Sequence, residues 1–234
     1  MLGFPEMVFT GIRVVATCMM LSLGISHVES AKLTDAIVRK EVAEKLDVDP
    51  EKVKILRRYR DYWIIEVDGT KYKVYQDPLS DKALELAELA SKHGIGPEVI
   101  SDRIMKMVPG SPLNPSGLTA DAEIRRFAAF MKKVSSLRKA SGGRVVSPGT
   151  GGRINVIVGD DGDFHIVDFT RAGEEDLYQF LGCVLCRFCI LGRGLVVFLT
   201  VYLGRPPTDD EVEKVYAAIS EKMRVLHGGR YASH

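Results

Sequence analysis

Two Asp-Gly pairs, each set between short β-prone runs, constrain the fold of this chain more than any other feature. One pair is Asp68-Gly69, and the other is Asp161-Gly162 within the stretch GGRINVIVGDDGDFHIVDF, residues 151–169. Asp-Gly between apolar runs strongly indicates a two-residue hairpin turn, because glycine readily adopts the positive φ that such turns require. The sequence therefore predicts two antiparallel hairpins at well-separated places in the chain.

The predicted register of the second hairpin brings two polar side chains together. With Asp161 and Gly162 as the turn, counting outward along both strands places Asn155 directly opposite Asp168. A carboxylate and an amide oxygen at one strand end are suitable ligands for a hard cation such as Mg²⁺. A polar cross-strand pair without a metal explains the same spacing, so the register alone leaves both interpretations open.

Composition gives few indications of function. The 234 residues carry a formal net charge of +1, so no strong charge signal points to nucleic acid or to a membrane surface. Asn and Gln are rare beside the charged residues, a bias that is typical of thermostable proteins. Cys183, Cys186 and Cys189 have a spacing also found in iron–sulfur ligation, but their segment is apolar and helix-like, so we expect them to pack in the core.

An apolar segment from Val8 to Ser26 lies near the start of the sequence. Arg13 interrupts it and no basic region comes before it, so it fits poorly to a membrane-spanning helix or a secretory signal peptide. We expect residues 1–29 to form an apolar extension or an added helix, and the protein to be cytoplasmic. A membrane anchor is the alternative.

The rest of the chain predicts an α+β organisation in two parts. Residues 30–108 would form two short helices, broken at Asp47–Pro50, and then an antiparallel sheet with one helix at about residues 80–93. Residues 109–234 would be mostly helical and contain the second hairpin, with a hinge near Val108–Pro112. The two short helices followed by strands also fit a helix-turn-helix DNA-binding regulatory module, with the helical half for dimerisation, although a Lys/Arg-rich recognition helix is missing.

From about residue 52 onward, the order of segments resembles the protein-kinase-like superfamily, nearest to choline and aminoglycoside kinases and to small atypical protein kinases. HGIGPEVI is similar to the end of the family's single N-lobe helix, and IMKMVPGSPL to its hinge. INVIVGDDGDFHIVDFTRAG is similar to its catalytic-loop Asn, hairpin and metal-binding Asp-Phe-Gly region, and DLYQFLG and YLGRPPTDDEVEKVYAAI to its late helices. The resemblance implies a two-lobed fold with a small antiparallel-sheet N-lobe and a mostly helical C-lobe.

The resemblance also implies a nucleotide site. Asn155 and Asp168 would hold the Mg²⁺ of ATP, and Lys73 would pair with the α- and β-phosphates. A solvated strand lysine, like Lys71, is the alternative for Lys73. Glu85 would be the helix partner of Lys73.

Two residues of the helix remain alternatives to Glu85. Asp81 and Glu88 lie on the same predicted face and fit the partner role as well. The phosphate-binding Gly-rich loop of the family is absent, because the first turn of the sheet reads RRYRDY. The arginines of that turn either contact phosphate or are ordinary surface residues.

The main departures from the family concern catalysis. Thr150 stands where the family has the Asp that accepts the substrate proton, five residues before Asn155, and Thr170 replaces the Gly of Asp-Phe-Gly. A neutral hydroxyl does not replace a carboxylate as a base. We therefore expect Mg-nucleotide binding with weak or absent phosphotransfer, in a pseudokinase or a weak atypical kinase. A scaffolding pseudokinase would also bind a protein partner.

Overall fold

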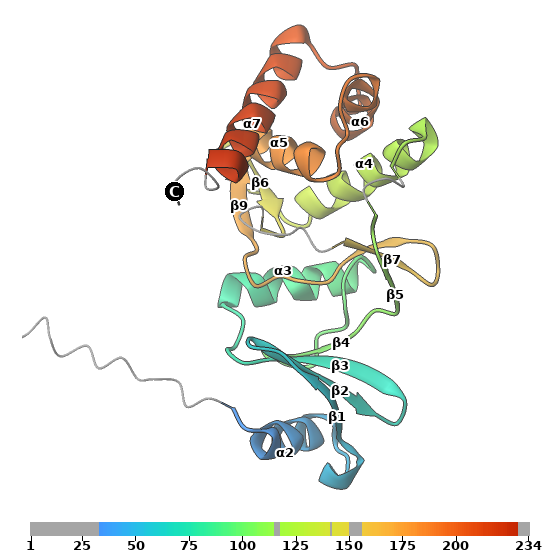
Figure 1. Cartoon of the computed structure of the whole chain (residues 1–234), viewed down its shortest axis with the longest axis vertical. Coiled ribbons are helices and arrows are strands. Elements are labelled where there is room, and N and C mark those ends of the chain that lie inside the picture. The colour runs from blue at the N-terminus through green and yellow to red at the C-terminus, as the bar shows by residue number, and fades with distance from the viewer. Residues whose placement is uncertain (1–32, 115–117, 141, 150–155, 229–234) are drawn as a thin grey trace, which may run out of the picture. The chain divides into compact units, whose positions relative to one another are not determined.

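The computed structural model describes residues 33–114, 118–140, 142–149 and 156–228, and Leu33–His234 form one compact unit (Figure 1). The apolar segment predicted at residues 1–29 lies outside the described residues, and so do Thr150 and Asn155. Among the helices of the described part, none is both long enough and apolar enough to cross a membrane.

A four-stranded antiparallel sheet occupies the first half of the described chain. Its strands are hydrogen-bonded in the order β1 (Lys54–Arg58), β2 (Tyr62–Val67), β3 (Thr70–Tyr75) and β4 (Ile104–Lys106). The predicted Asp68-Gly69 turn joins β2 to β3, and its residues have φ angles of 48° and 80°. A two-residue turn with two positive φ angles matches the twist of the strands that it connects.

One helix precedes the sheet and covers one of its faces. This helix, α2 (Asp35–Leu46), begins at Thr34, whose hydroxyl accepts a hydrogen bond from the Ile37 backbone N–H. The second predicted helix is only a three-residue 3₁₀ turn, η1 (Pro50–Lys52). The described residues before β1 therefore hold no second helix that could enter a DNA groove, and the helix-turn-helix interpretation is not favoured.

The two faces of the sheet have different environments, because side chains alternate along each strand. On the inner face, Ile64 pairs across the strands with Lys73, and Tyr62 pairs with Tyr75. The outer face packs against α2 in a hydrophobic core of its own. That core includes Val38, Val42, Trp63, Ile65, Val67 and Val74.

Helix α3 (Asp81–Lys92) lies between the sheet and the helical half (Figure 1). Ser80 caps its first turn by accepting a hydrogen bond from the Ala83 N–H, and Gly94 follows its end at φ 66°, so the helix lies where the sequence predicts it, at about residues 80–93. Its buried stripe belongs to the same hydrophobic core as the phenylalanines of the helical half. That stripe comprises Ala83, Leu86, Ala87 and Ala90.

The second half is mostly helical, and the predicted α+β class is confirmed. Its helices are α4 (Asp121–Ser135), α5 (Leu177–Arg187), α6 (Arg193–Leu203) and α7 (Asp209–Gly228), with α4 packed on α6 and α5 on α7. One small sheet comprises β5 (Gly110–Pro112), β7 (Val156–Gly159) and β8 (Phe164–Ile166), and another comprises β6 (Arg144–Ser147) and β9 (Gly173–Asp176). The sequence did not predict β9, because Gly-Glu-Glu-Asp has low strand propensity.

The second hairpin forms, but its predicted register is wrong by one residue. Val156 pairs with Ile166 rather than with Val167, and the Gly159 N–H donates to the Asp163 carbonyl at 2.8 Å. The loop therefore has three residues instead of two, with Gly162 at φ 82° in its last position. The predicted pairing of Asn155 with Asp168 therefore has no support from the observed register of β7 and β8, and Asn155 itself lies outside the described residues.

The three cysteines in α5 and just after it differ in exposure. Cys183 is buried in the core, half-buried Cys186 packs against it, and Cys189 is exposed, so the predicted core packing fails only for Cys189 among the three. Within the described ranges, no three His, Cys, Asp or Glu side chains are grouped as ligands for a metal ion.

Candidate functional site

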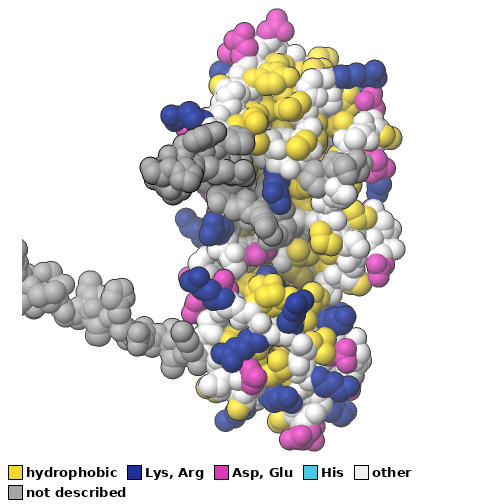
Figure 2. Space-filling view, in the orientation of Figure 1, with side chains coloured by type: hydrophobic (Ala, Val, Ile, Leu, Met, Phe, Trp, Pro, Cys, Tyr) yellow, Lys and Arg dark blue, Asp and Glu magenta, His cyan; other side chains and the backbone are white. Residues whose placement is uncertain are grey.

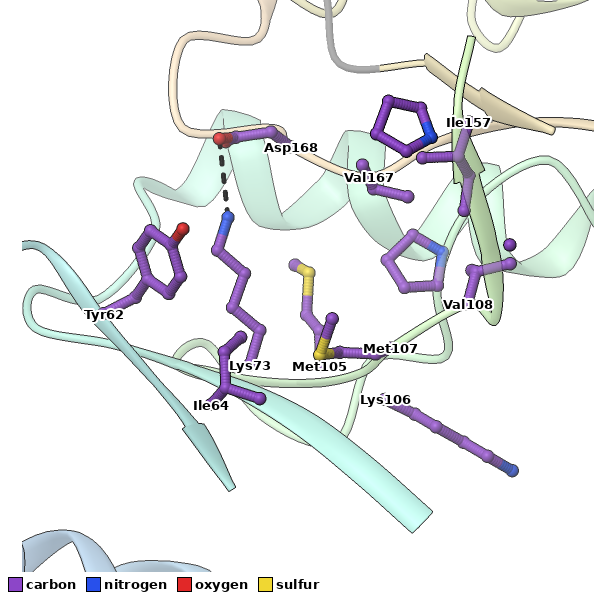
Figure 3. Close-up of a pocket in the computed structure, with 13 residues that line it drawn as sticks. Tyr62, Ile64, Lys73, Met105, Lys106, Met107, Val108, Ile157, Val167 and Asp168 are labelled. Atoms are coloured by element: carbon purple, nitrogen blue, oxygen red, sulfur yellow. Dashed lines mark hydrogen bonds and ion pairs between the residues drawn. The ribbon is translucent and has the colours of Figure 1, made fainter. Parts of the chain in front are cut away.

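A cavity of about 340 Å³ lies between the inner face of the sheet and the segment that follows β8 (Figure 3). Lys73 and Asp168 lie toward one end of it, and Val108 and Ile157 lie toward the other. Its mostly apolar walls and small number of polar groups are typical of small-molecule sites. The apolar lining includes Ile64, Met105, Met107, Val108, Ile157 and Val167.

Strand β4 and the residues after it border the cavity with backbone polar groups. The Met107 N–H donates to the Lys71 carbonyl at 2.8 Å, and the Lys106 N–H donates to the Glu98 carbonyl at 2.9 Å. Successive residues of a strand direct their backbone groups to opposite sides. The Lys106 carbonyl therefore points away from β3, on the edge where Lys106 and Val108 line the cavity.

Lys73 forms an ion pair with Asp168 across the cavity. The distance from Lys73 Nζ to Asp168 Oδ2 is 3.4 Å, and the two side chains are 16% and 25% exposed. The ammonium group also lies 4.6 Å from the Tyr62 ring centre and 4.5 Å from that of Tyr75, within the range of cation–π attraction. Burial lowers the pKa of Lys73, and the nearby Asp168 offsets part of this effect. Lys73 is therefore not a solvated strand lysine like Lys71, which is exposed.

The Asp168 carboxylate is held in place by its neighbours in the chain. Its Oδ1 atom accepts hydrogen bonds from the Thr170 backbone N–H at 3.0 Å and from the Thr170 hydroxyl at 2.8 Å. Phe169, which is 1% exposed, anchors the segment in the core. Burial opposes ionisation of Asp168, but Lys73 and the Thr170 donors outweigh it, so the pKa of Asp168 lies below its ordinary value.

Two tyrosines complete the charged end of the cavity. Figure 3 shows the Tyr62 hydroxyl beside the Lys73–Asp168 pair. The buried Tyr75 hydroxyl has no hydrogen-bond partner among the described residues. Burial raises the pKa of both tyrosines, and the Asp168 charge raises it further, so both hydroxyls remain protonated. Sequence reasoning missed both residues, although the predicted Asp68-Gly69 hairpin joins the two strands that carry them and Lys73.

The arginines before β2 have local partners. Arg57 lies over the Tyr59 ring at 5.3 Å, Arg58 lies over the Trp63 ring at 5.5 Å, and Arg60 is 3.5 Å from Asp61. Figure 2 shows Lys and Arg side chains spread around the sheet and interspersed with acidic ones. These contacts match the ordinary surface role of the arginines.

The structure does not bring Glu85 to Lys73. The Glu85 carboxylate accepts a hydrogen bond from Arg138 at 3.2 Å, and Arg138 also binds Glu174 of β9 at 2.7 Å. The alternatives Asp81 and Glu88 are exposed, as Glu85 is. The reason is the helical period: the apolar stripe of α3 faces the core and turns these acids outward. Thr150 and Asn155, both outside the described residues, have no observed place in the site.

Comparison with known proteins identifies the fold. No family model and no curated protein matches the sequence. Solved structures that resemble the chain include an ethanolamine kinase from Plasmodium vivax, with a TM-score of 0.55 at 12% identity over 89% of this chain and 84% of that one. A choline kinase from Streptococcus pneumoniae gives 0.54 at 10% identity over 79% and 88%. APH(2")-IIa, in a ternary complex with streptomycin and ATP, gives 0.53 at 10% identity over 82% and 88%. The chain therefore has the two-lobed, protein-kinase-like fold of the choline and aminoglycoside kinases.

Proposed function

We propose that this protein binds a Mg²⁺-nucleotide, ATP in the first instance, in the cavity beneath the sheet, and that it transfers phosphate weakly or not at all. The observation that carries the proposal is the Lys73–Asp168 ion pair at the polar end of an apolar cavity. A nucleotide has the matching division, with a flat apolar base at one end and anionic phosphates at the other.

Each part of the cavity has a distinct task in this proposal. The base would lie between Ile64 and Ile157 and would hydrogen-bond to the backbone edge near Lys106. Lys73 would bind the phosphates as a fixed positive charge. Asp168, with its ionised carboxylate oxygens, suits a hard cation such as Mg²⁺, which neutralises phosphate charge when bound. Asn155 is proposed as the second metal ligand.

The expectation of weak transfer depends on Thr150. A general base contributes about a hundredfold or more to a rate, and threonine at neutral pH cannot accept a proton as a carboxylate does. Phosphoryl transfer depends mainly on positioning and charge neutralisation, so a protein without the general base can still turn over slowly. In this proposal the protein acts chiefly as a scaffold that binds a protein partner in a nucleotide-dependent way.

Thermal unfolding with and without nucleotide tests the proposal. At a ligand concentration of about 100 times Kd, binding stabilises the folded state by about 2.7 kcal/mol. We expect MgATP to raise the Tm of the full chain, and Asp168→Ala and Lys73→Met to abolish the rise. Lys71→Met is the matched control. Lys71 lies two residues before Lys73 on the same face of β3, but its side chain is exposed to solvent. No rise with MgATP, or an equal loss in the Lys71 control, would contradict the proposal.

A further inference from the structure

The two oxygens of the Asp168 carboxylate have different surroundings. Oδ1 accepts two hydrogen bonds, from the backbone N–H and from the hydroxyl of Thr170, at 3.0 and 2.8 Å. Oδ2 lies 3.4 Å from Lys73 Nζ, on the side of the cavity. A carboxylate oxygen has two lone pairs, so the two Thr170 donors occupy the acceptor capacity of Oδ1.

Of the two hydrogen bonds to Asp168 Oδ1, only the one from the Thr170 hydroxyl depends on the residue type at position 170. A backbone N–H at position 170 would donate to Oδ1 with any amino acid other than proline there, whereas the second donor comes from the Thr170 hydroxyl. Buried Phe169 fixes the segment between the two residues. Thr170 itself is exposed, so its side chain serves no packing need that would account for its identity.

The difference between the two oxygens bears on which cation the site accepts. Ca²⁺ takes about six to eight oxygen ligands and often binds both oxygens of one carboxylate, whereas Mg²⁺ requires a near-octahedral shell and keeps several waters. We propose that Thr170 is a specificity-determining residue: by occupying Oδ1, its hydroxyl restricts Asp168 to metal binding through Oδ2 alone and so favours Mg²⁺ over Ca²⁺. This inference rests on the proposed function and names the cation specificity of the same site.

Metal titrations of the full chain with bound ATP test the inference without reference to turnover. Mn²⁺, followed by its paramagnetic resonance signal, serves as the probe, and Mg²⁺ and Ca²⁺ are then used to displace it. Thr170→Val removes the hydroxyl and keeps the branched shape and the backbone N–H, and Thr170→Ser keeps the hydroxyl. Thr200→Val is the matched control, because the Thr200 hydroxyl donates within its own helix, α6, to the Val196 carbonyl at 2.7 Å.

We expect the ratio of Ca²⁺ to Mg²⁺ affinity to rise about tenfold in Thr170→Val, which corresponds to about 1.4 kcal/mol, the size of one hydrogen bond to a charged group. Thr170→Ser and Thr200→Val should keep the parent ratio. An unchanged ratio in Thr170→Val, or an equal rise in Thr170→Ser, overturns the inference and leaves nucleotide binding intact. If Thr170→Val does not fold, Thr170→Ala provides the same comparison. Absence of ATP-dependent Mn²⁺ binding in the parent instead removes the proposed function and this inference with it.

Discussion

Gly110 stands where the chain leaves the four-stranded sheet and enters the second half, and the structure predicts that it tolerates no side chain. Its φ is 147°, a conformation that residues with a Cβ rarely adopt. A Cβ at this position would contact the Val158 carbonyl oxygen and would lie 2.8 Å from Gly159 Cα. Both neighbours are backbone atoms of β7, so they cannot move aside as a flexible side chain would.

The expected cost of Gly110→Ala has two parts. Backbone strain contributes about 1–3 kcal/mol, and steric overlap in a packed site contributes about 1–3 kcal/mol more. A total of about 4 kcal/mol would lower Tm by about 10 °C in a chain of this size. Gly69→Ala is the matched control, since Gly69 also has a positive φ, 80°, but a Cβ there meets no atom within 4 Å.

Urea unfolding and thermal unfolding of the two variants measure this difference. We expect Gly69→Ala to lose only about 1 kcal/mol, from backbone strain alone. Gly110→Ala should also weaken MgATP binding, because Gly110 lines the cavity. Equal losses of stability in the two variants would refute the reasoning, since they would show that the backbone contact with β7 does not matter.

Three further predictions concern catalysis, pH and the network around α3. Thr150→Asp should raise phosphotransfer by about a hundredfold in a radiolabelled-phosphate assay, whereas Thr150→Ala should leave the MgATP-induced Tm shift nearly intact. The hydrogen bond from Arg205 lowers the pKa of Glu211 to about 2, so the ionised carboxylate stabilises the folded state above its ordinary pKa of 4.5. Glu211→Gln should therefore destabilise the protein at pH 7, and the difference should shrink as the pH falls from 4.5 toward 2. Arg138→Met should cost about 1–2 kcal/mol in urea unfolding, because it leaves two carboxylates without their partner; no loss would mean that solvent replaces the contact.

The sequence predicted the elements that depend on local chemistry. The Asp68-Gly69 hairpin, the helix at about residues 80–93 and the helical second half all follow from turn residues and apolar periodicity. The second hairpin shows where such reasoning ends. Gly-Asp-Asp-Gly-Asp fits a two-residue or a three-residue loop with Gly162 at positive φ in either case, and the choice moves every cross-strand pair by one position.

The charged end of the cavity was only partly predictable. Lys73 and Asp168 followed from the family resemblance, and their 3.4 Å contact joins segments far apart in sequence. The sequence did not predict that Glu85 pairs with Arg138. The periodicity of α3 separates buried from exposed positions, but it does not say which basic residue contacts an exposed carboxylate. Tyr75 was missed because an aromatic residue in a strand is ordinarily a packing residue.

The division of the hydrophobic residues into two cores has a consequence for how the protein opens. The outer face of the sheet shares one core with α2, whereas α3 shares the other with the helical half and the β7–β8 hairpin, and the inner face of the sheet adds Tyr75 and Met105 to this second core. Regions that bury a common set of side chains tend to unfold together. Amide hydrogen exchange should therefore protect α3 to the same degree as the helical half, although α3 lies between β3 and β4 in the sequence. Lys73 would then lie on a strand whose outer face belongs to the core of α2, and Asp168 in the unit of the helical half, so a ligand that binds both side chains would slow the exchange of both regions.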